Sequence, residues 1–148
     1  MREAAESHRG LFPEHADAYG ENVRAKLERC LRVTDAELEA ALRRLEEYRE
    51  RAAEAIEGVD LLVTPTLAFV APAAIRDDLE IRDAVIRFTY PFNALGWPAL
   101  ALPCGRAEHG LPASLQLVAP VGQDAHVLAA GFLLELALAT RLGGTAET

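Results

Sequence analysis

A thiol and an imidazole five residues apart are the first pair in this sequence that could carry out nucleophilic chemistry. Cys104 and His109 lie around one short polar segment, and an imidazole can take the proton of a neighbouring thiol. No third group that would orient the imidazole lies near them in sequence, so we interpret them as a thiol at the end of a buried strand and a histidine in a surface loop. The four histidines show no metal-ligand spacing with a carboxylate, and no metal site is predicted for His8, His15, His109 and His126.

Composition limits the class of protein and its partners. The 148 residues are 51% hydrophobic and 26% charged, which is enough apolar material for one domain with a core. A net charge of −8 argues against nucleic acid or an anionic membrane as the main partner, because both attract clustered Lys and Arg. The chain opens on charged residues without an apolar run, and Cys30 and Cys104 form no CxxC pair, so reduced thiols and a cytoplasmic location are expected.

Charged residues are concentrated in the first part of the chain, which favours solvated helices there. Residues 1–60 hold 25 of the 38 charged side chains. A first helix is predicted over His15–Cys30. A second begins at Thr34, because Thr34 and Glu37 form a capping box, and it ends near Gly58. Helical spacing predicts the inward face of this second helix as Leu38, Leu42, Leu45, Ala52 and Ile56.

The second part of the chain predicts strands and apolar helices. Continuous apolar character indicates strands covered on both faces, and three are predicted: Val59–Thr64, Ala99–Pro103 and Ala113–Val118. A loop over Leu67–Ile75 and a helix over 77–90, with Asp77 or Asp78 as its cap, separate the first two. The last helix is predicted over 123–142. It is apolar almost all round and is therefore expected to be buried on most sides.

These elements predict an α/β protein in two parts. Residues 1–58 form a mainly helical, charged part, and residues 59–148 form the sheet and the apolar helices. Three short strands make a narrow sheet. Strands that are buried on both faces and a helix that is apolar all round need more polypeptide packed against them than this chain contains. The sequence therefore predicts a missing partner surface.

An ordered series of Asn, Gly and Pro positions carries a resemblance to one family. The series opens with Asn93-x-x-Gly96-x-Pro98 and continues through Pro103, Gly105, Pro112, Gln116 and Pro120. The strand-then-proline segment 60–66 precedes it, and Gly122-Gln123-Asp124 follows it. On these residues the chain resembles the carboxy-terminal portion of the amidase-signature hydrolases. The likeness covers nearly the whole chain but only the last part of the family's domain.

The resemblance implies a fold and a reaction. The fold is a partial amidase-signature fold, α/β, with a small mixed sheet and flanking helices, incomplete relative to the family domain. The reaction is hydrolysis of the carbon–nitrogen bond of a small amide, without metal or organic cofactor. In the family a lysine relays protons through a bridging serine held in a cis peptide, a second serine attacks the carbonyl, and backbone amides of a Gly/Ser-rich loop hold the oxyanion.

The groups that this mechanism needs are missing from the sequence. The chain has two serines, Ser7 and Ser114, and one lysine, Lys26, which lies in a charged amphipathic helix where a solvated side chain is expected. It has no Gly/Ser-rich motif. We therefore assign no catalytic residue and expect the chain to be a fragment that is inactive alone.

With no catalytic residue assigned, the role that the resemblance implies for this chain is to line a substrate pocket. It assigns the wall of this pocket to Asn93, Gly96, Trp97, Pro98 and Gln116. Two of these residues have a structural alternative, since Trp97 could be a core aromatic and Gln116 could be hydrogen-bonded within the fold. At Ser114 the family usually has glycine, and the added hydroxyl would narrow the space beside the pocket.

Two classes of function stay open. In the first, the chain is part of an amidase whose small amide substrate binds only to the complete protein. In the second, it is a non-catalytic association module that pairs with itself or with the missing amino-terminal portion. A subunit of a tRNA-dependent amidotransferase is a third option, which the acidic charge does not support. Neither nucleic acid nor a membrane is expected as a partner.

Overall fold

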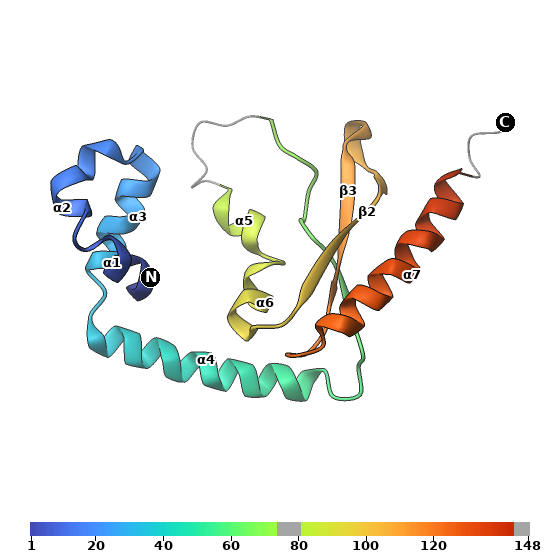
Figure 1. Cartoon of the computed structure of the whole chain (residues 1–148), viewed down its shortest axis with the longest axis horizontal. Helices are drawn as coiled ribbons and strands as arrows, with labels where there is room; N and C mark the ends of the chain where they lie inside the picture. The colour runs from blue at the N-terminus through green and yellow to red at the C-terminus, as the bar shows by residue number, and fades with distance from the viewer. Residues whose placement is uncertain (74–80, 144–148) are drawn as a thin grey trace.

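Three short helices form a lobe at the amino terminus. Figure 1 shows the computed structural model, which describes residues 1–73 and 81–143, with side chains in the last helix described up to residue 139. Helix α1 (Arg2–His8) packs against α3 (Glu21–Leu31), with α2 (Phe12–His15) between them in sequence. The lobe has its own small core of buried side chains, namely Ala5, Phe12, Leu27 and Cys30.

The prediction of a single helix over His15–Cys30 is wrong at its start. Gly20 has an extended ψ of 147° and caps α3, so the helix begins only at Glu21. The residues before it form a separate 3-10 turn, Ala16–Ala18, and Tyr19 then folds back onto the lobe. The hydroxyl of Tyr19 lies 2.9 Å from Nδ1 of His8, which fixes the end of α1 against this turn.

Helix α4 (Asp35–Ala55) begins with the predicted capping box. The backbone N–H of Glu37 donates to Oγ1 of Thr34 at 3.2 Å, and the backbone N–H of Thr34 donates to Oε2 of Glu37 at 2.9 Å. The hydrogen bonds from Thr34 lower the pKa of the Glu37 carboxyl. None of the helix's residues is fully buried, and Leu42 is 55% exposed, so the predicted inward face is wrong at Leu42. Gly58, with φ at 77°, follows the helix.

Within the described residues the sheet has three strands, as predicted, in the order β1-β3-β2. They are β1 (Leu62–Pro65), β2 (Ala99–Arg106) and β3 (Pro112–Val118). The helices and this sheet confirm the predicted α/β fold class. Both strand pairings are antiparallel, so the prediction of a mixed sheet is wrong for the residues described. Strands β2 and β3 form a hairpin through the turn Glu108–Gly110, in which His109 takes a left-handed backbone (φ 57°).

Helix α7 (Asp124–Gly143) covers one face of the sheet across β2 and β3 (Figure 1). The core between them is Leu102, Leu117, Ala119 and Val127. Gly131 faces β2 so closely that a Cβ there would overlap Cδ2 of Leu100. The outer face of α7 is open, and the expectation that this helix is buried on most sides is wrong, since more than half of each side chain is exposed at Leu128, Phe132, Leu133 and Leu136. Within the described residues, no helix is long and apolar enough to cross a membrane.

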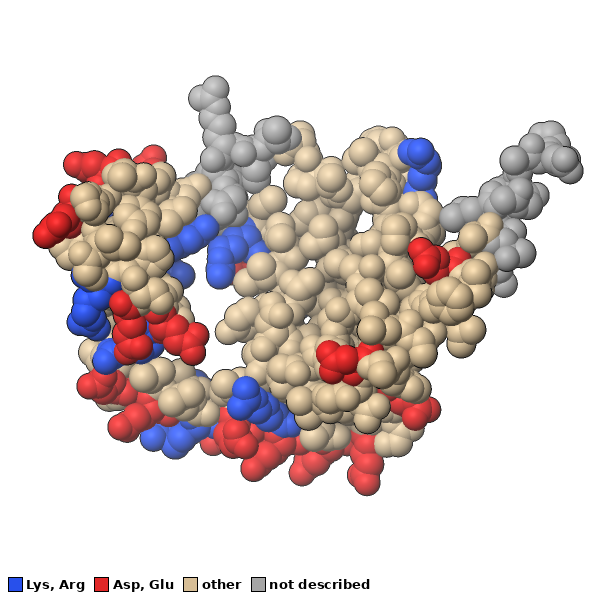
Figure 2. Space-filling model, in the orientation of Figure 1, with Lys and Arg blue, Asp and Glu red and all other residues tan. Residues whose placement is uncertain are grey.

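Two short helices, α5 (Arg82–Ile86) and α6 (Tyr90–Leu95), lie beside the sheet between β1 and β2 in sequence. The predicted helix start at Asp77 or Asp78 lies outside the described residues. The expected two-sided burial of strands is confirmed at the end of β3, where residues 116–118 are buried, but not in β2, where Ala99, Ala101 and Pro103 are exposed. Figure 2 shows the charged side chains gathered over α1–α4, whereas the face over the sheet and α7 is mostly uncharged.

Candidate functional site

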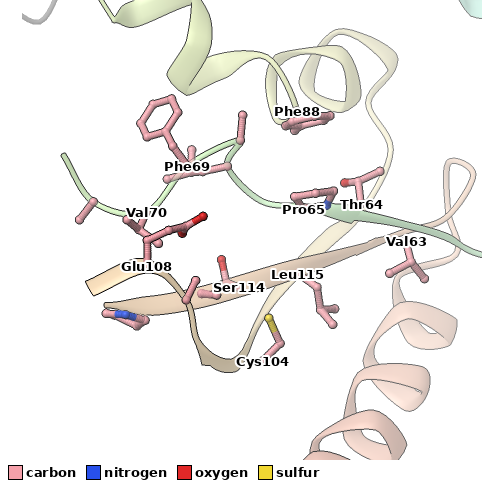
Figure 3. Close-up of a pocket in the computed structure, with 16 residues that line it drawn as sticks. Val63, Thr64, Pro65, Phe69, Val70, Phe88, Cys104, Glu108, Ser114 and Leu115 are labelled. Carbon is pink, nitrogen blue, oxygen red and sulfur yellow. The ribbon is translucent and has the colours of Figure 1, made fainter. Parts of the chain in front are cut away.

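A cavity of about 740 Å³ lies where the chain leaves β1, beside the β2–β3 hairpin (Figure 3). We call it the hairpin cavity. The loop 67–71 lies along one side of it and the hairpin along the other, while Phe88 approaches from the segment between α5 and α6. Its lining consists of Val63, Thr64, Pro65, Leu67, Ala68, Phe69, Val70, Ala71, Phe88, Cys104, Ala107, Glu108, Pro112, Ala113, Ser114 and Leu115.

The hairpin cavity is mainly apolar and carries little charge. Among its described lining residues, Glu108 is the only one with a formal charge, and the polar side chains are Thr64, Cys104 and Ser114. Figure 3 shows the Glu108 carboxylate beside Val70 and the Ser114 hydroxyl on the side of β3 that faces the loop. Such a lining can hold an apolar group and orient it with a few polar contacts.

The five residues assigned to the pocket wall by resemblance do not line the hairpin cavity. Trp97 lines a second cavity of about 490 Å³ between α4 and α6, where its ring stacks on Phe92 at 6.4 Å between centroids. Asn93 is exposed, Gly96 caps α6 with φ at 71°, and the carbonyl of Pro98 accepts a hydrogen bond from the N–H of Ala119. Their assignment to a substrate-pocket wall stays a prediction.

Gln116 has both of its amide hydrogens engaged within the fold. Its Nε2 donates to Oγ1 of Thr64 at 3.1 Å and to the carbonyl of Phe88 at 2.9 Å, and the residue is 4% exposed. These bonds tie β3 to β1 and to the segment that carries Phe88. Gln116 therefore positions two residues of the hairpin cavity, although it does not line the cavity itself.

Sequence reasoning missed the residues that line the hairpin cavity, above all Phe69, Val70 and Phe88. One signal was present, because the loop after β1 is apolar, whereas surface loops are usually polar. An apolar loop needs apolar surroundings, and the structure supplies them from the hairpin and from Phe88.

The two serines and the lysine are not gathered in one place. Ser7 lies in α1, Lys26 in α3 and Ser114 in β3. Figure 1 places the lobe of α1 and α3 on the far side of α5 and α6 from the sheet. Among them only Ser114 lines the hairpin cavity.

The predicted thiols and histidines can also be placed. Cys30 and Cys104 are free cysteines, as predicted. Cys30 is buried in α3, whereas Cys104 is half-buried within β2 and does not lie at the end of a buried strand. Cys104 lines the hairpin cavity, and His109 is exposed in the turn of the hairpin. In the part of the chain that the structure describes, no three His, Cys, Asp or Glu side chains could hold a metal ion together.

Comparison with known proteins identifies the family. The model of the Amidase family matches residues 3–128, and the chain belongs to this family. It is 39% identical over 90 residues to one component of the glutamyl-tRNA(Gln) amidotransferase of Acaryochloris marina, a match that covers 59% of the chain and 18% of that protein. AmiD of Mycobacterium tuberculosis, described provisionally as an amidase, is 28% identical over 121 residues, which is 78% of the chain and 26% of AmiD.

Solved structures confirm the fold. A crystal structure of an amidase superposes with a TM-score of 0.81 at 35% identity and covers 90% of the chain and 32% of the amidase. A 6-aminohexanoate cyclic dimer hydrolase superposes with a TM-score of 0.63 at 25% identity, over 98% of the chain and 33% of the hydrolase. The chain thus spans about a fifth to a quarter of the length of these curated relatives and about a third of these solved chains.

Proposed function

We propose that this chain is the carboxy-terminal part of an amidase-signature domain that hydrolyses the carbon–nitrogen bond of a small amide. The observation that supports this most strongly is the match to the Amidase family over most of the chain, together with a largely apolar cavity of a size suited to a small molecule. In this proposal residues 59–148 form part of the structure around the amide-binding site. Residues 1–58 form the helical lobe and α4, which precede that part in the sequence.

The catalytic groups come from polypeptide outside these 148 residues. Amide hydrolysis needs an activated nucleophile, a base and oxyanion donors in one place. The only serine at the hairpin cavity is Ser114, and the single lysine lies in the separate amino-terminal lobe. We therefore expect the chain alone to be inactive and its small amide substrate to be turned over only by the completed domain, without metal or organic cofactor.

The outer face of α7 is the surface on which the rest of the amidase-signature domain would pack. Four large apolar side chains on it are more than half exposed, and Val121 just before the helix is exposed as well. Contiguous apolar surface of this kind marks an interaction site in soluble proteins. The relatives carry roughly three quarters to four fifths of their length outside the matched segment, so the rest of an amidase-signature domain is the partner that we propose for this face.

A chimera tests this proposal. The matched carboxy-terminal segment of the 35%-identical amidase is replaced by this chain, and release of ammonia from a panel of small amides is measured. We expect the chimera to hydrolyse these amides, and we expect no hydrolysis after the serine nucleophile in the part retained from the parent amidase is changed to alanine. A chimera that is folded by circular dichroism, yet turns over no amide that the parent amidase accepts, would contradict the proposal.

A non-catalytic association module is the second candidate, and the exposed face of α7 is the observation that favours it. Mass measurement in solution and binding of a hydrophobic dye separate the possibilities. A module that pairs with itself should form a concentration-dependent dimer. A monomer that binds no dye would contradict association with any partner through α7.

Two finer assignments are part of the same proposal. We place the protein in the cytoplasm, since both cysteines are free thiols. Several relatives are subunits of a tRNA-dependent amidotransferase, but a net charge of −8 disfavours binding of RNA, so nucleic acid is not among the proposed partners.

A further inference from the structure

We propose that the hairpin cavity binds the apolar group of a neutral or cationic amide, and that Glu108 makes the site discriminate against amides that carry a carboxylate. This inference rests on the proposed amide hydrolysis, because it names the class of substrate. It concerns binding of the apolar group and charge selectivity, which can be measured on this chain without catalysis, and it departs from the expectation that the amide binds only to the complete protein.

The first step is the character of the cavity's walls. Its volume of about 740 Å³ falls within the range of small-molecule sites, and aromatic or branched side chains contribute much of the lining, such as Phe69, Val70, Phe88 and Leu115. Burying an aryl or branched alkyl group against such walls is favourable in proportion to the apolar area removed from water. A polar chain would lose its hydration there and find few groups to replace it.

The second step is the charge at the cavity. Glu108 is the only charged residue of the described lining, and none of the described lining residues is Lys or Arg. The nearby Arg106 lies outside the lining, and its Nη1 donates to the carbonyl of Gly110 at 2.7 Å. A carboxylate on the bound amide would therefore lack a cationic partner from the described lining and would meet a like charge. A neutral group meets no such penalty, and a cationic group gains a partner.

The third step is the fixed position of Glu108. It begins the 3-10 turn of the hairpin, and two backbone hydrogen bonds hold the base of this turn, from the N–H of Ala107 to the carbonyl of Leu111 at 2.9 Å and from the N–H of Gly110 to the carbonyl of Ala107 at 3.0 Å. The Arg106 side chain spans the same turn. These bonds hold the backbone at Glu108, and its carboxylate lies beside the loop wall in Figure 3.

Cys104 provides a direct readout of occupancy. It lines the cavity and is half-buried, whereas Cys30 is buried in the separate amino-terminal lobe. A ligand in the cavity should slow modification of Cys104 by a small thiol reagent. Peptide mass spectrometry reports the modification of each cysteine separately, so Cys30 serves as the internal reference in the same sample.

The experiment compares three amides of similar size with the 148-residue chain: benzamide, 4-(aminomethyl)benzamide and 4-carboxybenzamide. We expect the first two to protect Cys104 at lower concentration than the third, by about fivefold, which is the factor for two like charges about 4 Å apart in water. Glu108→Gln should remove most of this difference by improving protection by 4-carboxybenzamide. The matched control Glu57→Gln, at an exposed glutamate away from the cavity, should leave the difference unchanged.

Each result decides one part of the proposal. If none of the three amides slows modification of Cys104, the hairpin cavity is not a binding site for apolar amides. If 4-carboxybenzamide protects as well as benzamide, or if Glu108→Gln changes nothing, the role of Glu108 is wrong. All of these outcomes are independent of hydrolysis, so they are distinguishable from failure of the amidase chimera.

Discussion

Replacing Gln116 should loosen the sheet and the hairpin cavity together. Its amide donates two hydrogen bonds, to Thr64 on β1 and to the carbonyl of Phe88, from a side chain that is almost completely buried. Gln116→Leu keeps most of the volume but removes both donors. Each lost bond costs about 1 kcal/mol, and leaving buried acceptors without this donor adds to the loss. We expect the free energy of unfolding to fall by about 2–3 kcal/mol in urea titrations.

Gln116→Glu provides a matched test, because it changes the donor group and almost nothing of the shape. When the introduced carboxyl is protonated it can still donate one hydrogen bond, so the variant is then close to the parent. When it is ionised it faces two oxygen acceptors in a buried site, which raises its pKa in the folded state above the unfolded value of about 4.3. A raised pKa of an acid means that stability is retained below the unfolded pKa and lost as the pH rises through the folded one.

The measurement is the stability of both variants relative to the parent at about pH 4 and about pH 7. We expect the leucine variant to show the same loss at both values. The glutamate variant should lose an additional amount at the higher pH, about 1.4 kcal/mol for each unit by which the pKa is raised. If both variants remain within about 0.5 kcal/mol of the parent at both values, Gln116 does not join the segments as described.

Three further predictions test other elements. Gly131→Val should lower the free energy of unfolding by about 1–3 kcal/mol, because the new side chain overlaps β2. Its control, Ala129→Val on the exposed side of α7, should lower it by about 0.6 kcal/mol. Equal losses in urea titrations would contradict the packing of this helix. By NMR titration the pKa of Glu37 should lie below its ordinary value, because Thr34 donates hydrogen bonds to its carboxylate. The capping contribution is therefore present above the unfolded pKa and is lost as the pH falls through the folded pKa; an unshifted or raised pKa would refute the capping box as the cause. Leu133→Arg on the outer face of α7 should weaken association and dye binding at unchanged helical content. Ala53→Arg, at an exposed position of α4, is the control for added charge, and equal effects of the two would speak against an apolar interface on α7.

Elements specified by short-range chemistry were predictable from the sequence. The start of α4 follows from Thr34 and Glu37 alone, because the two residues satisfy each other's backbone groups within one turn. The start of α7 and the presence of the strands β2 and β3 were also predicted, since turn residues precede the helix and separate the strands. The start of α3 was missed, because Gly20 interrupts a helix-compatible pattern without disrupting its apolar spacing.

Features that depend on packing between distant segments could not be predicted in this way. Leu42 and Leu133 fit an apolar pattern, yet both are more than half exposed because nothing in the described chain covers them. The hairpin cavity joins residues from Val63 to Leu115, and its loop wall has no periodicity to reveal it. Trp97 and Gln116 were assigned to the pocket wall by resemblance, which indicates where each residue lies relative to the series of Asn, Gly and Pro residues but not which surface its side chain faces.

Hydrolysis by the purified 148-residue chain is the measurement that tests the central claim most directly. Ammonia release from benzamide should equal the rate in buffer, because we propose that the nucleophile, the base and the oxyanion donors come from polypeptide outside these 148 residues. Ser114→Ala and Cys104→Ala, which remove the serine hydroxyl and the thiol at the hairpin cavity, should leave that rate unchanged. Turnover above the buffer rate that disappears in either variant would mean that this chain carries its own catalytic site.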